Sequence, residues 1–211
     1  MSVKLGSTAI KGIYLGTNEI KKMYLGSNLV YQKSGYVDTE FTSCPFPTNW
    51  TEVTAGTKYN ATNEYGEWNI WADNFYHDIL GNDKYLYFAF DRNNSTCWQS
   101  SEHSDVTNSF EIGIDLPLKT LINPTSIFIS SAYQGNIKSE TKVMGYNPLT
   151  DNWEELGTIN IHSVATDTNI TITNNVFYSK FKLVMYRYSA TKKYNMVYEF
   201  QITSGTLRKE S

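Results

Sequence analysis

The chain has 211 residues, of which 15% are aromatic and only 18% charged, and its formal net charge is −3. That length suits one good-sized domain with a single core and a small appendage. The weak negative charge argues against nucleic acid as the main partner. No apolar stretch is long enough to insert into a membrane or to form the core of a signal peptide, so we expect a protein made in a cytoplasm.

The first 33 residues repeat with a period of ten. Residues 5–10, 15–20 and 25–30 align without gaps, each as a Gly-containing turn that leads into a short strand. We expect stacked hairpins or a small solenoid that is marginal alone and serves as an arm for assembly. The arm carries five lysines and one acid, a net +4, which leaves −7 for the rest. Those lysines indicate either an acidic docking partner or a solvated strand face protected against edge pairing.

Residues 34–47 are expected to form a linker, because Ser34-Gly35 and two prolines interrupt the pattern. The main domain is expected over 48–205, with a polar tail over 206–211. Period-two alternation, short apolar runs and turn signals predict its strands, and their close spacing indicates an all-β sandwich. The predicted strands are 50–57, 67–72, 85–90, 110–116, 125–130, 141–146, 170–173, 181–188 and 196–202.

One stretch carries a resemblance to a known family. Residues 89–98 read Ala-Phe-Asp-x-Asn-x-x-Thr-x-Trp, and segments 110–116, 143–156 and 198–202 follow in a matching order. The chain resembles the galactose-binding-like jelly rolls, which include discoidin and factor V/VIII type C domains and carbohydrate-binding relatives in bacterial enzymes. This resemblance implies a jelly-roll β-sandwich with Trp98 and Trp153 in packing positions. The ten-residue repeats resemble segments of bacteriophage tail and other virion proteins.

The loop after Phe90 is a candidate calcium site. Asp91, Asn93 and Thr96 offer a carboxylate, an amide oxygen and a hydroxyl within six residues, a donor set that suits Ca²⁺. Glu199 stands where the resemblance places an acid on the closing strand. The alternative is a turn whose polar side chains are satisfied by its own backbone.

Ligand binding is expected on loops at one end of the sandwich. We expect an aromatic ring with a planar donor to hold a sugar there, drawn from Arg92, Tyr133, Arg187 and Tyr188. Trp68 and Trp71 are three residues apart in a strand, so they should point to opposite faces, with one of them exposed. No catalytic constellation is evident, and we expect a protein that is not an enzyme.

Cys44 and Cys97 are too few for a disulfide scaffold and are expected to be two buried thiols, a pair between them being the alternative. The sequence as a whole favours a bacteriophage virion protein in which a carbohydrate-binding adhesive domain contacts cell-surface or environmental glycan. Residues 1–33 would bind other virion proteins or form a homo-oligomer. The rival interpretations are a structural virion protein without a ligand and a carbohydrate-binding module of a secreted bacterial protein.

Overall fold

The structure, a computed structural model, describes residues 35–73, 85–100, 109–133, 139–161, 166–186 and 195–210, together with short strands within 1–34. The chain forms two compact units, residues 38–209 and residues 1–37 with 210–211. The smaller unit contains three two-stranded antiparallel hairpins. Their strands are β1 (Lys4–Leu5), β2 (Thr8–Ala9), β3 (Tyr14–Leu15), β4 (Asn18–Glu19), β5 (Lys22–Leu25) and β6 (Asn28–Gln32).

The hairpins reproduce the ten-residue period in their register. Leu5 pairs with Thr8, Leu15 with Asn18 and Leu25 with Asn28, so two residues of the sequence separate the paired strands of each hairpin, and the first of the two is a glycine. Antiparallel pairing within each unit belongs to one of the two forms expected of the repeats, stacked hairpins or a small solenoid. Two-residue turns of this kind favour glycine because their backbone requires positive φ angles.

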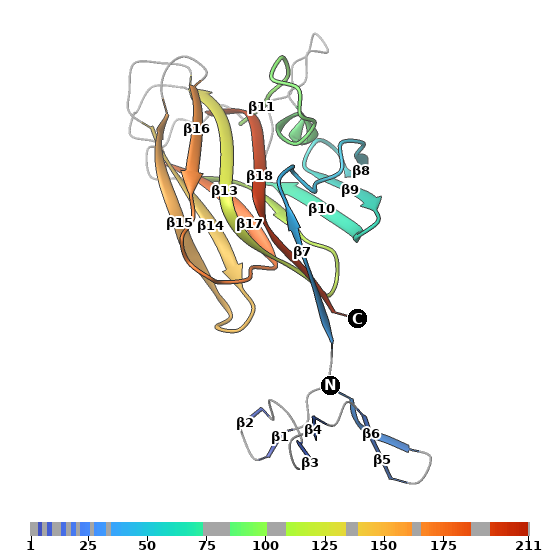
Figure 1. The fold of residues 1–211 in the computed structure, drawn as a ribbon. Coiled ribbons are helices and arrows are strands. Elements are labelled where there is room, and N and C mark those ends of the chain that lie inside the picture. The colour runs from blue at the N-terminus through green and yellow to red at the C-terminus, as the bar shows by residue number, and fades with distance from the viewer. Residues whose placement is uncertain are drawn as a thin grey trace. The chain divides into compact units, whose positions relative to one another are not determined.

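The larger unit is a sandwich of two antiparallel sheets (Figure 1). One sheet has seven strands in the order β15-β14-β17-β12-β10-β9-β8, and the other has the order β11-β18-β13-β16 with β7 paired to β18. The strands are β7 (Tyr36–Phe41), β8 (Thr51–Thr54), β9 (Lys58–Asn63), β10 (Gly66–Ala72), β11 (Trp98–Gln99), β12 (Phe110–Asp115), β13 (Thr120–Tyr133), β14 (Ser139–Asn147), β15 (Asn152–Ile161), β16 (Thr166–Thr171), β17 (Lys180–Tyr186) and β18 (Asn195–Glu210). Among the residues described, no helix has the length and apolarity needed to cross a bilayer.

The core lies between the two sheets and is rich in aromatic side chains. In β12, Phe110, Ile112 and Ile114 point inward and are at most 2% exposed, as period-two alternation requires. Large rings from both sheets complete this core, and each is fully buried: Trp68, Trp98, Tyr178, Phe181 and Phe200. Both cysteines are buried thiols, as expected, and burial raises the pKa of Cys44 to about 11.

Residues 85–90 were expected to be a strand, and this expectation is wrong. They contain a 3₁₀ helix, η1 (Leu86–Ala89). The backbone N–H of Phe88 donates to the carbonyl of Tyr85, and that of Phe90 donates to the carbonyl of Tyr87, in each case three residues earlier. Leu86 and Ala89 are fully buried, because residues three apart lie on one side of a 3₁₀ helix. An apolar run without alternation fits a buried strand and a buried helical turn equally well.

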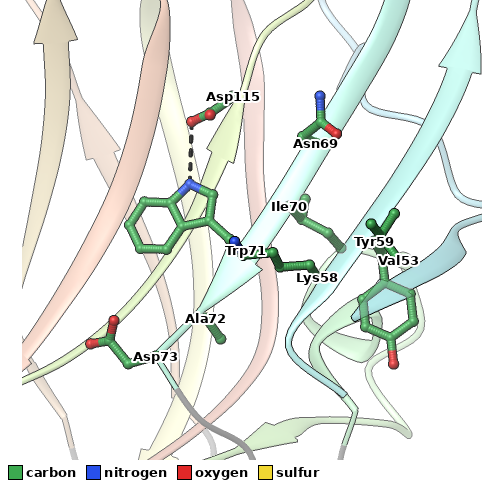
Figure 2. Close-up of a pocket in the computed structure, with 9 residues that line it drawn as sticks. All are labelled: Val53, Lys58, Tyr59, Asn69, Ile70, Trp71, Ala72, Asp73 and Asp115. Atoms are coloured by element: carbon green, nitrogen blue, oxygen red, sulfur yellow. Dashed lines mark hydrogen bonds between the residues drawn. The ribbon is translucent and has the colours of Figure 1, made fainter. Parts of the chain in front are cut away.

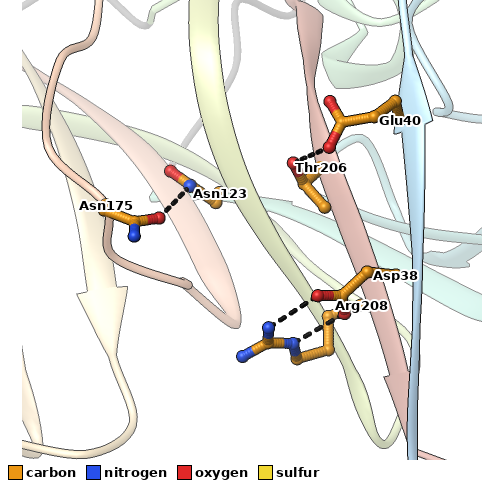
Figure 3. Close-up of polar contacts among 6 residues, drawn as sticks. All are labelled: Asp38, Glu40, Asn123, Asn175, Thr206 and Arg208. Carbon is orange, nitrogen blue, oxygen red and sulfur yellow. Dashed lines mark hydrogen bonds and ion pairs between the residues drawn. The ribbon is translucent and has the colours of Figure 1, made fainter.

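The expected boundaries at the two ends of the domain also differ from the structure. The segment expected as a linker contains β7, and the segment expected as a polar tail is the end of β18, whose residues up to Lys209 pair with β13. Figure 3 shows the polar contacts that join the two. Arg208 donates to both carboxylate oxygens of Asp38 at 2.7 and 2.6 Å, and Thr206 donates to Glu40 at 2.6 Å.

Candidate functional site

A pocket of about 440 Å³ opens beside the outer face of the seven-stranded sheet, among residues of β8, β9, β10 and β12 (Figure 2). Its most useful feature for binding is the indole of Trp71, which is half-buried. Polar side chains surround that ring, and an exposed Val53 forms the outer rim. The polar lining side chains are Lys58, Asn69, Asp73 and Asp115.

Gly113 determines how the Trp71 ring lies. It pairs with Trp71 across β10 and β12, and a Cβ atom on it would fall 2.5 Å from Cζ2 and 2.6 Å from Cε2 of the indole. The ring therefore rests directly on the glycine backbone. Trp71 Nε1 donates to Oδ1 of Asp115 at 3.2 Å, which fixes the rotation of the ring. One indole face covers the sheet, and the ring borders the pocket as a flat, oriented surface.

Two carboxylates flank the indole. Figure 2 shows Trp71 between Asp115, joined to it by a hydrogen bond, and Asp73 at the end of β10. Asp73 is held in place from both directions, because its N–H donates to the carbonyl of Glu111 at 3.1 Å and its Oδ2 accepts from the N–H of Glu111 at 3.0 Å. Burial raises the pKa of Asp73. A planar ring beside fixed hydrogen-bond acceptors is suited to binding a polyhydroxylated ligand.

The sequence predicted the orientation of the two tryptophans of β10. Trp68 and Trp71 do lie on opposite faces: Trp68 is fully buried and donates to Asn63 at 2.8 Å, whereas Trp71 is on the outer face. The contributions of Gly113 and Asp115 were missed, because alternation marks them only as outward positions. Trp98 is in the core as expected, but Trp153 is not. It pairs with Tyr146 on the outer face of the sheet, because the neighbouring Gly145 faces the core against Tyr178.

The four expected ligand residues do not form a described group. Arg92 has a φ of 59°, and its Nη2 donates to the carbonyls of Cys44 and Phe46 at 2.6 Å each, so it braces the segment before β8. Tyr133 ends β13, where its backbone pairs with Asn195, and its side chain lies outside the described residues. Arg187 and Tyr188 also lie outside them.

The expected metal ligands, by contrast, are brought together. Asp91 accepts from the N–H of Asn93 at 2.9 Å and from Thr96 Oγ1 at 2.8 Å, and Asn93 Oδ1 accepts from the N–H of Ser95 at 3.1 Å. These bonds are the ones expected from the alternative interpretation, in which the loop is a turn whose polar side chains are satisfied locally. Glu199 faces this loop from β18, fully buried, and its Oε1 has no hydrogen-bond partner among the described residues.

Electrostatics at Glu199 are unfavourable for a bare carboxylate. Burial, with the nearby Asp91 among the further causes, raises the pKa of Glu199 to about 7. Burial also raises the pKa of Asp91. Within the described residues no group of three or more His, Cys, Asp or Glu side chains is placed to hold a metal. Two adjacent acids with one unpartnered oxygen, beside amide and hydroxyl oxygens, still fit a hard cation such as Ca²⁺.

No known protein family matches the chain by sequence, and no curated protein does. The fold is similar to that of the C-terminal domain of a chitobiase from Bacteroides fragilis, with a TM-score of 0.51 and 17% identity over 69% of this chain and 97% of that one. The domain thus has the jelly-roll β-sandwich fold that the sequence predicted.

Two further solved structures are similar at lower scores. A family 32 carbohydrate-binding module from C. perfringens NanJ, in complex with galactose, has a TM-score of 0.49 and 12% identity over 71% of this chain and 98% of that one. A GH29 fucosidase from Ruminococcus gnavus, in complex with fucose, has a TM-score of 0.49 and 16% identity over 68% of this chain. This chain matches only 25% of the length of that fucosidase.

Proposed function

We propose that the sandwich is a carbohydrate-binding adhesive domain and that the Trp71 pocket is a sugar-binding site. The observation that carries this proposal is the Trp71 indole, laid flat on Gly113 and oriented by Asp115 beside a pocket of about 440 Å³. A pyranose presents a C–H face that packs on an indole, while its hydroxyls donate to carboxylate and amide oxygens. Trp71 supplies the ring, and Asp73, Asp115 and Asn69 supply the acceptors.

A glycan array on the purified chain tests this proposal, with Trp71→Ala beside the wild type. Binding of at least one glycan class is expected, with a loss of about tenfold or more in the variant, since an aromatic contact of ~1.4 kcal/mol corresponds to that factor. Leu149→Ala is the matched control, because Leu149 is 91% exposed in a turn away from the pocket. A blank array favours a structural protein without a ligand.

We further propose that residues 1–33 attach this domain to a larger assembly, a bacteriophage virion, and that glycan adhesion benefits from many copies on one particle. The support is the repeated hairpin, whose register recurs every ten residues, and the resemblance of its units to phage virion segments. Hairpins of this size bury little surface alone, so they require a partner. Weak single-site affinity is then multiplied by copy number. If this domain were found only within secreted bacterial enzymes, the rival interpretation would be favoured, namely a carbohydrate-binding module of a secreted protein.

A structural calcium ion is the third part of the proposal. Asp91 and Glu199 would provide the carboxylates, with Asn93 and Thr96 supplying neutral oxygens from the same loop. Such an ion would neutralise two adjacent acids and link the loop after η1 to β18. Calcium that binds only the folded state stabilises it by RT ln(1 + [L]/Kd), about 2.7 kcal/mol at a hundredfold excess over Kd. Elemental analysis of dialysed protein and melting curves with and without chelator test it.

A further inference from the structure

A second indole on the same outer face extends the proposed site. We propose that Trp153 forms a subsite adjacent to the Trp71 pocket and that the two together bind a neutral, linear oligosaccharide; this inference rests on the proposed function. The residues between and around the two rings, here called the aromatic strip, are Trp71, Glu111, Tyr146, Trp153 and Lys182.

A lysine side chain contacts one face of the Trp153 ring. Lys182 Nζ is 4.6 Å from the centroid of that ring, and the Lys182 side chain is only 14% exposed. The Tyr146 ring meets the Trp153 ring edge-on, with centroids 5.4 Å apart and an interplanar angle of 65°. Lys182 and Tyr146 therefore both hold the position of the indole. Trp153 is half-buried, so part of the ring remains open to a ligand.

Strand register places the two rings beside each other. The Trp71 ring rests on Gly113 of β12, and Gly113 pairs with Lys182 of β17, whose Nζ lies over the Trp153 ring. Neighbouring strands are about 4.8 Å apart, so rings over adjacent strands are separated by roughly 5–10 Å. That spacing suits consecutive units of one sugar chain that runs across the strands.

Charge pairing on this face favours a neutral ligand. Lys182 contacts both oxygens of Glu111 at 2.8 and 2.9 Å. Lys142 pairs with Glu155 at 2.9 Å and Lys180 with Asp115 at 3.6 Å. Each of these three lysines thus has a carboxylate partner, and Asp73 adds a further acid. At the pocket, Lys58 and Asp73 carry one charge of each sign, so this face has no excess of positive charge to favour an anionic sugar, whereas neutral hydroxyls meet acceptors.

The experiment compares ligands of two lengths by NMR titration of the full chain. The probes are methyl glycosides of glucose, galactose and mannose, the corresponding β-1,4-linked tetrasaccharides, and α-1,4-linked tetragalacturonate beside its neutral methyl ester, a pair with the same linkage and different charge. For wild type we expect a neutral tetrasaccharide to bind about tenfold or more tightly than its monosaccharide, and tetragalacturonate to bind more weakly than its neutral methyl ester. Trp153→Ala should abolish the gain with length, so that the variant binds the tetrasaccharide no more tightly than the monosaccharide.

Trp153→Leu keeps an apolar cover on Lys182 without a planar ring, and it should behave like Trp153→Ala if folding is intact. A length gain that survives both substitutions, or a wild type that binds tetragalacturonate best, overturns the strip as a neutral oligosaccharide site. If in that case Trp71→Ala still abolishes monosaccharide binding, the proposed function is retained and only the strip is rejected. Absence of binding to all probes overturns the two proposals together.

Discussion

At the scale of single residues, Gly113 matters because it has no side chain. The Trp71 ring occupies the space where any other side chain would begin. We predict that Gly113→Ala tilts the indole off the sheet, since a contact of 2.5 Å cannot persist. Sugar affinity should fall nearly as far as in Trp71→Ala, with a stability loss of about 1–3 kcal/mol. Parallel titrations and denaturant melts measure the two effects, and unchanged affinity would show that the ring has no need of its support.

The raised pKa of Glu199 predicts that the stability of the folded protein depends on pH. Its pKa in the folded state, about 7, lies above the ordinary value of 4.5, so the folded protein holds this proton more tightly than the unfolded chain. In chelator, stability should be fully present below about pH 4.5 and decline as the pH rises to 7. Asp91, whose pKa is also raised, acts in the same direction.

Glu199→Gln, which cannot ionise, should flatten this decline in chelator. Added Ca²⁺ should raise the wild-type melting temperature more at pH 7.5 than at pH 5, and it should leave the variant almost unmoved. Melting temperatures across pH 4–8 provide the measurement. A wild type that gains stability between pH 5 and pH 7 in chelator would contradict this assignment.

At the scale of elements, alternation in the sequence was a good guide where one strand face is buried. Residues 110–116 and 67–72 were predicted almost to their ends, as β12 and β10. β9 was missed because its segment, KYNATN, is mostly polar and buries only Tyr59 and Ala61. Of the candidate site, only the outward placement of one of Trp68 and Trp71 followed from the sequence, and the ligand residues expected on loops do not line this pocket. The support from Gly113 and the outward placement of Trp153 depend on cross-strand register, which local patterns do not contain.

The pairing of β13 with β18 contains an irregularity that a glycine makes possible. Pro124 pairs with Gly205, and the register shifts between Pro124 and Ser126 because proline has no N–H to donate. A Cβ on Gly205 would lie 2.4 Å from the carbonyl oxygen of Asn123. We predict that Gly205→Ala destabilises the sandwich by about 1–3 kcal/mol. Denaturant unfolding tests this, and Ser204→Ala, beside it in the strand, is the control expected to change little.

The contact of β7 with β18 should contribute less than its geometry suggests. Asp38 and Arg208 form a two-point ion pair, but their side chains are 43% and 31% exposed. Exposed pairs contribute about 0–1 kcal/mol. Arg208 also lies 3.8 Å from the Phe177 ring centroid, so Arg208→Ala should cost more than Asp38→Ala. A double-mutant cycle by thermal melting separates the two contributions, and equal losses would show that the ring contact adds nothing.

At the scale of the whole molecule, the arm and the sandwich should separate cleanly in function. Deleting residues 1–33 keeps β7 and every strand of the sandwich, so the melting temperature should be unchanged. The truncated protein should be monomeric by light scattering and should keep its affinity for a soluble glycan. It should lose binding to multivalent surfaces, since copy number supplies that strength. A truncated protein that keeps the full-length oligomeric state would show that residues 1–33 do not mediate assembly.

The most direct test of the account follows the indole signals of the five tryptophans in an NMR titration with a glycan from the array. Trp71→Phe assigns the Trp71 Nε1–H signal, and Trp68, whose Nε1 is bonded to Asn63, is the internal control. We predict that the Trp71 signal shifts saturably with the binding isotherm while the Trp68 signal stays in place. Saturable glycan binding that leaves the Trp71 signal unmoved would contradict the claim that this pocket is the sugar site.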